Sequence, residues 1–243
     1  MTLLDLTLRS PAENLAMDEA LLDNAEAGSQ EEVLRFWESP TPFVVVGYSN
    51  KIASEVDITA CESGGIPILR RCSGGGTVVQ GPGCLNYALI LRITDDGPTR
   101  NITAANQFIM ERNRTAFSFI NDFPSALNLS VRGHTDLVLN DLKFSGNSQR
   151  RRKNFLLFHG TFLLNFDLGL VTELLRFPSA QPDYRANRGH SEFVTNLSVP
   201  PGSIRVAIAK AWGAILDNTS PPLESTGHLV REKYSKAEWN KKF

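Results

Sequence analysis

The chain has 243 residues, 42% of them hydrophobic, and a formal net charge of −1 at pH 7. This balance excludes both the strongly basic composition of many nucleic-acid-binding proteins and the apolar-poor composition of a disordered chain. No stretch approaches the roughly 20 consecutive apolar residues of a membrane span, and the N-terminus lacks the cationic and apolar regions of a signal peptide. The three cysteines, an odd number at wide spacing, favour a reducing cytoplasm over a disulfide framework.

Local patterns along the chain predict helices alternating with groups of short strands. Ser10 and Pro11 are typical of a helix start, and the apolar residues that follow recur at helical spacing. Strand-like apolar runs come next, and we expect the first two to pair across a proline-containing turn. In chain order the expected elements are helix 11–26, strands 33–37 and 43–47, helix 57–63, strands 66–71, 76–80 and 85–92, helix 101–121, strands 127–131, 136–139, 142–145, 155–158 and 161–166, and helices 169–176 and 203–216.

Most of the predicted strands follow one another at hairpin-scale distances, without a helix between them. This order predicts an α+β fold, with a mostly antiparallel sheet and helices packed on its outside. Residues 1–217 are expected to form one domain. The stretch from Asn218 to Ser225 is expected to be a linker into a polar tail, so that residues 218–243 add no complete accessory domain.

The most informative segment is a glycine-rich loop that follows an apolar run at 66–69. It has the sequence Arg-Arg-Cys-Ser-Gly-Gly-Gly from Arg70 to Gly76. Glycine lets a ligand approach the backbone closely, and successive exposed N–H groups in such a turn can bind an anion. Arginine adds a planar set of donors that suits phosphate or carboxylate. The segment therefore indicates either a site for an anionic small molecule or a tight turn with two solvated arginines.

A second segment contains an isolated lysine. Two strand-like runs flank Asn140 and Asp141, a pair typical of a hairpin turn, and Lys143 follows at once. Strand alternation places Lys143 on one face with Ser145 and Asn147. A point charge among small polar groups suits phosphate or carboxylate binding, although a lone lysine is more commonly a solvated surface residue.

Taken in order, these segments resemble those of the lipoate–protein ligase family, within the wider group of biotin ligases, lipoate ligases and octanoyltransferases. The resemblance spans roughly residues 10 to 200 and includes motifs that are each moderate evidence alone. The matching stretches are Asn14–Ala20, Arg70–Gly76, Asp136–Val138, Lys143–Gly146, His159–Asn165 and Val194–Leu197.

The resemblance implies a two-step reaction. Lipoate or octanoate would react with ATP, accompanied by Mg²⁺, to give an acyl-adenylate and pyrophosphate, and the acyl group would pass to a lysine of a lipoyl-domain protein. It also implies that Lys143 is the catalytic residue and holds the carboxylate and the phosphate, with Asp136 as a candidate Mg²⁺ ligand. The residues expected beside the adenylate are Arg71, Gly76, Thr77, Val78 and Val79. Those expected in the wall of the acyl pocket are Ser73, Gly74 and Gly75, and Arg150 and His159 are expected close to the same pocket.

Three alternatives remain open at this point. An octanoyltransferase would move octanoyl from acyl-carrier protein without ATP, and the resemblance implies a nucleophilic cysteine late in the chain. Here Cys61, Cys72 and Cys84 all precede the His159 region. We expect Cys61 to be buried and Cys72 to be exposed enough for modification. A biotin ligase would have a differently ordered arginine- and glycine-rich loop, and a binding module would deliver its ligand without chemistry.

Several further features separate this chain from the common family pattern. After the glycine loop the family often has His-Asp-x-Gly-Asn, where this chain has Gln80 to Cys84. Many family ligases carry a C-terminal accessory domain, which a separate subunit would supply here if one is required.

The basic run at 149–153 predicts a solvated turn or a rim that attracts an acidic acceptor domain. The polar loop at 182–190 predicts a surface connection or a segment that closes over the adenylate.

Overall fold

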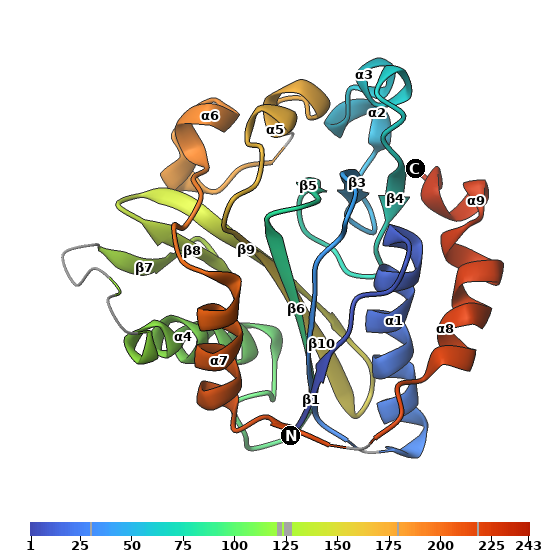
Figure 1. Ribbon diagram of the computed structural model, residues 1–243, viewed down its shortest axis with the longest axis vertical. Helices are drawn as coiled ribbons and strands as arrows, with labels where there is room; N and C mark the ends of the chain where they lie inside the picture. Colours follow the sequence, from blue (N-terminus) through green and yellow to red (C-terminus); the bar gives the residue numbers. More distant parts are fainter. Residues whose placement is uncertain (30, 121–122, 124–127, 179, 218) are drawn as a thin grey trace.

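The strands form two sheets among the residues that the structure describes (Figure 1). This computed structural model describes residues 1–29, 31–120, 123, 128–178, 180–217 and 219–243. The larger sheet has the strand order β11 (Ile215–Leu216), β1 (Thr2–Asp5), β2 (Val33–Trp37), β6 (Cys84–Arg92), β10 (Phe155–Leu163), β9 (Leu142–Arg151), β8 (Asp136–Leu139) and β7 (Leu129–Arg132). The smaller sheet has the order β4 (Ile68–Arg70), β3 (Phe43–Val46) and β5 (Val78–Gln80).

Helices cover both faces of the larger sheet (Figure 1). Buried side chains of α4 (Ile102–Ala116) and α7 (Pro201–Trp212) share one core with β2, β6 and β10, and α1 (Pro11–Asn24) packs on the opposite face. The shorter helices are α2 (Ile52–Glu55), α3 (Ile58–Ser63), α5 (Gly169–Leu174), α6 (His190–Phe193), α8 (Leu223–Leu229) and α9 (Ala237–Asn240), with single turns η1 (Ala25–Ser29), η2 (Phe117–Phe119), η3 (Asp183–Arg185) and η4 (Val230–Tyr234). The expected α+β fold with a mostly antiparallel sheet is confirmed.

Local sequence signals account for several element boundaries. The Ser10 hydroxyl accepts from the Glu13 backbone N–H and the Glu13 carboxylate accepts in return, which closes a capping box at the start of α1. The β8–β9 hairpin turns at Asn140 and Asp141, whose φ values of 49° and 65° are those of a primed turn. Residues 121 and 127, at the ends of two predicted elements, lie outside the described residues.

The predicted pairing of strand 33–37 with strand 43–47, which are β2 and β3 in the structure, is wrong. β2 pairs with β1 and β6 in the larger sheet, whereas β3 pairs with β4 and β5 in the smaller one. The connection at 38–42 contains Pro40 and Pro42, which have no N–H to donate to a sheet. All four residues of β3 are buried, as expected for a strand that is covered on both faces.

Two strands are longer than local patterns predict. β9 continues to Arg151 instead of ending at 145, so the basic residues 150 and 151 belong to a strand and not to a turn. β10 runs without a break through Gly160, where the sequence predicted two strands. A side chain at Gly160 would overlap the Asn147 amide, so the glycine marks a close cross-strand contact and not an interruption.

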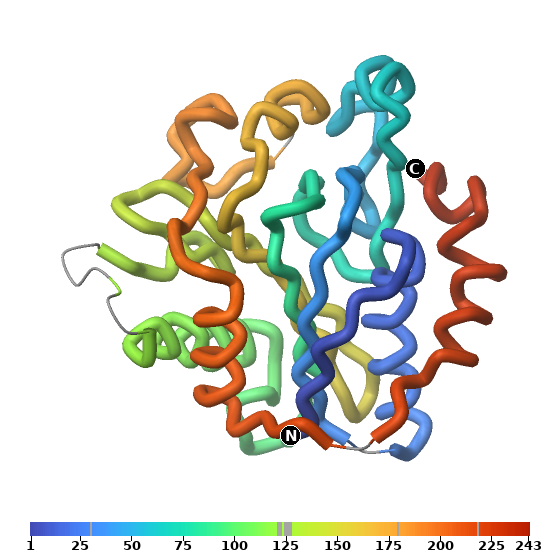
Figure 2. Tube along the Cα trace, in the orientation of Figure 1, coloured from blue at the N-terminus to red at the C-terminus, as the bar shows by residue number. Residues whose placement is uncertain are grey.

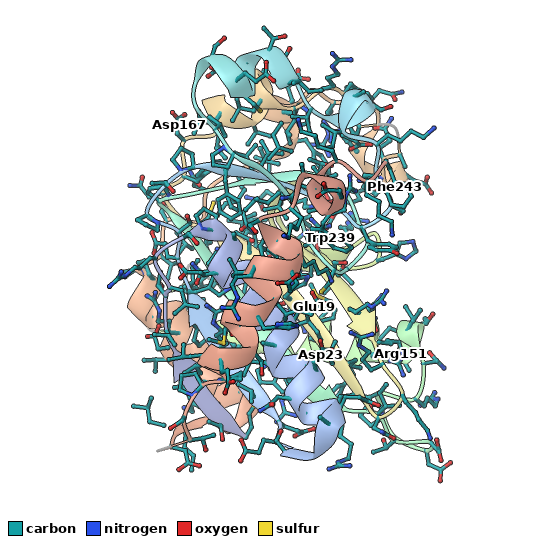
Figure 3. The ribbon with its side chains drawn as sticks, turned by 90° about the vertical axis from the view of Figure 1, so that its right-hand side faces the viewer. Glu19, Asp23, Arg151, Asp167, Trp239 and Phe243 are labelled. Atoms are coloured by element: carbon teal, nitrogen blue, oxygen red, sulfur yellow. The ribbon has the colours of Figure 1, made fainter. Side chains whose placement is uncertain are left out.

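The C-terminal residues pack along α1 instead of extending away from the domain. In the Cα trace the segment from α8 to α9 runs beside α1 for most of its length (Figure 2). Glu19 of α1, 4% exposed, accepts hydrogen bonds from Lys233 at 2.7 Å and Tyr234 at 2.8 Å. Figure 3 shows Glu19 on α1 beside the C-terminal helices. Asn218, the first residue of the predicted linker, lies outside the described residues. No helix in the described ranges is both long enough and apolar enough to cross a membrane.

Candidate active site

A cavity of about 840 Å³ is lined by residues of both sheets. The glycine loop, β5, β9 and β10 contribute to its walls, together with residues 175, 176, 178 and 180–185. Among the residues predicted for the site, those that line the cavity are Arg71, Gly75, Gly76, Thr77, Val78, Val79, Asp136, Lys143 and His159. The fold therefore brings together motifs that are up to 88 residues apart in the chain, since 159 − 71 = 88.

Arg71 holds the glycine loop in shape instead of presenting an open fork of donors. Its Nη2 donates to the carbonyl oxygens of Gly74 and Gly76, at 2.5 and 2.8 Å, and its Nε donates to the Ser73 hydroxyl at 3.1 Å. Only 8% of the residue is exposed, and burial lowers the pKa of Arg71 to about 10. The interpretation of two solvated arginines is wrong, because these donors satisfy backbone carbonyls that the glycine turn leaves unpaired.

Arg70 supports the neighbouring loop in the same manner. It is fully buried, and its Nη1 donates to the carbonyl oxygens of Gly47 and Asn50, at 2.8 and 2.9 Å. A side chain at Gly47 would overlap the carbonyl oxygen of Gly75, so the two loops touch through their backbones. The loop at 47–50 therefore fixes the outer side of the glycine loop.

Lys143, the lysine that the sequence motifs single out, lines the cavity together with Arg71, Arg132, Arg176 and Arg185. Its Nζ lies 2.8 Å from Oδ1 of Asp136, and the two side chains are 25% and 12% exposed. Gly146 makes room for it, because a Cβ built there would lie 2.8 Å from both Cε and Nζ of Lys143. A partly desolvated ammonium of this kind attracts an anion more strongly than one on the surface.

His159 belongs to a buried chain of polar contacts. Its Nε2 lies 2.5 Å from the Ser73 hydroxyl and its Nδ1 lies 3.3 Å from Oδ2 of Asp18, while Oδ1 of Asp18 lies 2.6 Å from Arg35. Ser73 and Arg35 are fully buried, and Ser73 does not line the cavity. The residue types are those of a nucleophilic triad, but the serine has no access to a substrate in this arrangement.

Two of the remaining predicted residues do not line the cavity. Gly74 does not line it, and the Arg150 guanidinium carbon lies 5.7 Å from the ring centroid of Tyr48. Arg150 is two residues beyond Ser148, which does line the cavity, so strand geometry carries its side chain roughly 7 Å further along β9. Arg150 is predicted to lie close to the pocket, and in the structure it stands just beyond the residues that line the cavity.

The cysteines are all buried and do not line the cavity. Cys61, Cys72 and Cys84 are 1%, 4% and 0% exposed, and none of them lines the cavity. Burial raises the pKa of Cys72 and of Cys84 to about 12. The expected burial of Cys61 is confirmed, whereas the expected exposure of Cys72 is wrong because its side chain joins the core between α1 and the larger sheet.

The sequence did not reveal the contact of Asp18 with His159 or that of Tyr184 with Asp136. Asp18 was matched only as part of a motif, although two adjacent acidic residues on the apolar side of a helix are a signal of buried charge. Tyr184 donates to Oδ2 of Asp136 at 2.7 Å, so both oxygens of that carboxylate are occupied. In the described part of the chain no group of three His, Cys, Asp or Glu could hold a metal ion, and Asp136 does not fit a ready-made Mg²⁺ ligand.

Comparison with known proteins gives the family. The model of the lipoyl protein ligase A/B catalytic domain matches residues 10–211. The octanoyltransferase LipM of Geobacillus kaustophilus is 26% identical, over 95% of this chain and 94% of that protein. Lipoate-protein ligase A subunit 1 of Thermoplasma acidophilum is 27% identical, over 93% of this chain and 90% of that protein.

Solved structures share the fold. A lipoate-protein ligase A bound with ATP has a TM-score of 0.83 and 24% identity, over 99% of this chain and 98% of that one. A bipartite lipoate protein ligase of Thermoplasma acidophilum, studied with its E2 lipoyl domain, has a TM-score of 0.82 and 24% identity, over 99% and 95% of the two chains. With motifs, cavity and fold in agreement, the chain belongs to the family of lipoyl protein ligase A/B catalytic domains, among whose similar members are enzymes named octanoyltransferases and lipoate–protein ligases.

Proposed function

We propose that this enzyme is an ATP-dependent lipoate–protein ligase. It activates lipoate or octanoate as the acyl-adenylate and transfers the acyl group to a lysine of a lipoyl-domain protein. The observation that carries this proposal is that Lys143 projects into a cavity bordered by the glycine loop, while every cysteine of the chain is buried outside that cavity. The likeness to an ATP-bound ligase structure supports the choice of ATP as co-substrate.

The first step joins two anions. A carboxylate oxygen of the acid attacks the α-phosphorus of ATP, a C–O–P linkage forms, and pyrophosphate leaves. Lys143 offsets the repulsion between carboxylate and phosphate, and Gly75 and Gly76 of the glycine loop line the same cavity. Gly76, Thr77, Val78 and Val79 border the adenylate, Arg71 keeps the loop in position, and His159 lies in the same cavity wall. Mg²⁺ enters with the phosphates of ATP, and the residues described here do not add a preformed site for it.

The second step transfers the acyl group. The neutral amine of the acceptor lysine attacks the acyl carbon, a C–N bond forms, AMP leaves with the electron pair of the broken C–O bond, and one proton of the amine is released to solvent. The Thermoplasma ligase is described as bipartite and was solved with its E2 lipoyl domain. By analogy, a lipoyl-domain protein is the proposed acceptor here, and a second subunit is a proposed partner.

A second candidate is octanoyl transfer from acyl-carrier protein without ATP. Relatives named LipM octanoyltransferases, such as that of Geobacillus kaustophilus, support this reading. Thioester chemistry through an enzyme thiol needs an exposed, ionisable cysteine. In this chain the three thiols are buried, and that favours adenylation.

The test compares the two donors directly. The purified chain is given a lipoyl domain with either octanoate, ATP and Mg²⁺ or octanoyl-acyl-carrier protein alone. We expect AMP and pyrophosphate in the first reaction, with a gain in acceptor mass equal to one octanoyl group. Transfer from the carrier protein without AMP formation would replace the ligase proposal by the transferase. Adenylate formation without transfer would support the first step and indicate a missing subunit.

A further inference from the structure

One wall of the cavity belongs to a segment with an unusual backbone. Residues 181–185 line the cavity, and the segment closes on itself because Gln181 donates to Oδ1 of Asn187 at 2.6 Å and its Oε1 accepts from the Asn187 backbone N–H at 3.2 Å. Ala186 and Asn187 both adopt left-handed φ values, 50° and 60°. Two consecutive non-glycine residues in this region are sparsely populated, so surrounding contacts must hold them there.

Two arginines supply those contacts. The guanidinium carbon of Arg185, a residue 5% exposed, lies 5.1 Å from the ring centroid of Phe177 and 4.7 Å from that of Phe193. Arg188 donates to the carbonyl oxygen of Tyr184 at 3.0 Å and to that of Asp141, in the β8–β9 turn, at 3.2 Å. The segment is therefore a fixed wall that rests on the hairpin carrying Lys143.

Tyr184 connects this wall to the cation of the site. Its hydroxyl donates to Oδ2 of Asp136 at 2.7 Å, and Oδ1 of the same carboxylate lies 2.8 Å from Lys143. The Tyr184 ring packs against Phe193, with the ring centroids 5.2 Å apart and the planes tilted by 41°. Burial, followed by the charge of Asp136, raises the pKa of Tyr184, so the hydroxyl stays a donor.

We propose that Tyr184 is a positioning residue for Lys143 and acts through Asp136. The inference rests on the proposed function, because it assumes that Lys143 receives the carboxylate of the acid. With Tyr184 bound to one oxygen, part of the Asp136 charge is neutralised and the carboxylate cannot rotate. Without the Tyr184 hydrogen bond, Lys143 is the main partner of Asp136. An incoming carboxylate must then compete for Lys143 with an Asp136 carboxylate that is more fully charged and less fixed in position.

The experiment measures octanoate binding by calorimetry in the absence of ATP. The variants are Tyr184→Phe, Asp136→Ala and the double variant, with Tyr48→Phe as the matched control, because the Tyr48 hydroxyl contacts Lys242 outside the cavity. We expect Tyr184→Phe to weaken octanoate binding about tenfold, the effect of one hydrogen bond to a charged group. In the Asp136→Ala background the same change should have no further effect, since its route to Lys143 is gone.

Each outcome decides the proposal. An equal loss in both backgrounds would mean that Tyr184 acts by packing the wall, and no loss in either would mean that it does nothing for Lys143; both overturn the inference. If Asp136→Ala unfolds, Asp136→Asn takes its place in the cycle.

In AMP formation, Tyr184→Phe should raise KM for octanoate and leave KM for ATP within about twofold, which a general loss of folding would not produce. If wild-type protein binds octanoate but forms no AMP, ligation fails as the function while the binding cycle still tests Tyr184.

Discussion

The side chains of Ser73 and His159 meet at 2.5 Å although they are 86 residues apart in the chain. This contact joins the glycine loop to β10, and Asp18 and Arg35 extend it to α1 and β2. Because Ser73 is fully buried, this chain of contacts fixes the relative position of the glycine loop, β10, α1 and β2, and it offers no free hydroxyl to a substrate. The serine is therefore structural in this arrangement.

We expect Ser73→Ala to reduce stability more than activity. The substitution leaves Nε2 of His159 without its partner, which costs about 1–3 kcal/mol in free energy of unfolding. Ligation should remain within about tenfold of the wild-type rate, a loss far smaller than that for a nucleophile. Urea unfolding and octanoyl transfer to a lipoyl domain measure the two effects. An octanoyl adduct that mass spectrometry locates on Ser73, and that the variant lacks, would instead identify it as a nucleophile.

Lys143→Ala should lower adenylate formation by about 10²–10³, the usual effect of removing one charge-stabilising donor. The physical reason is that two anions then meet in the cavity without a fixed cation beside them. Pyrophosphate release with octanoate and ATP is the measurement. Lys153→Ala, an exposed lysine outside the cavity, is the matched control and should stay within about twofold. Similar rates for both variants would remove Lys143 from the mechanism.

Gly146→Ala tests the same lysine without removing its charge. The new Cβ would lie 2.8 Å from Cε and Nζ of Lys143, so the side chain must move away from Asp136. We expect adenylate formation to fall about tenfold or more with a modest loss of stability. Gly202→Ala has open space around its Cβ and serves as the control. If the Gly146 variant keeps full activity with folding intact, the present position of Lys143 is not required.

Much of the fold and part of the site follow from local sequence. The β8–β9 hairpin was predictable because Asn140 and Asp141 suit its left-handed turn, and the glycine loop and Lys143 were found from residue type and spacing. The pairing of β2 and β3 was not predictable, since adjacency in sequence favoured a hairpin, whereas the two strands pair with partners in different sheets. Pairing across long sequence distances leaves little local trace.

The functions of the two arginines show the same limit. Adjacent cations beside glycines indicate anion binding, but Arg70 and Arg71 donate mainly to carbonyl oxygens of their own and neighbouring loops. The carbonyl oxygens of the loop at 47–50 become neighbours of Arg70 only after β3 and β4 pair. Asp18 and Tyr184 escaped notice for a related reason: each contacts its site across more than 45 residues, at sequence separations of 141 and 48.

The three thiols should be unreactive in the native enzyme. Burial raises the pKa of Cys72 and Cys84 to about 12, so at pH 8 the thiolate fraction is on the order of 10⁻⁴. Their folded pKa lies above the ordinary value of 9.0, so their contribution to stability is complete below pH 9 and is lost as the pH rises towards 12. Iodoacetamide at pH 8 should label none of them before unfolding and all three in urea. Rapid native labelling of one thiol, with loss of octanoyl transfer, would favour the transferase.

The C-terminal residues should matter for the site although they do not line its cavity. Oδ1 of Asn240 accepts from the backbone N–H of Arg70 at 2.9 Å, and the indole of Trp239 donates to the Arg70 carbonyl oxygen at 2.8 Å. Asn240→Ala leaves that buried N–H unpaired, at a cost of about 1–3 kcal/mol in free energy of unfolding. Because Arg70 supports the loop that touches Gly75, adenylate formation should fall as well. Urea unfolding and AMP formation by Asn240→Ala and by the exposed neighbour Lys241→Ala test this link, and equal behaviour of the two variants would show that the C-terminal helices do not support the glycine loop.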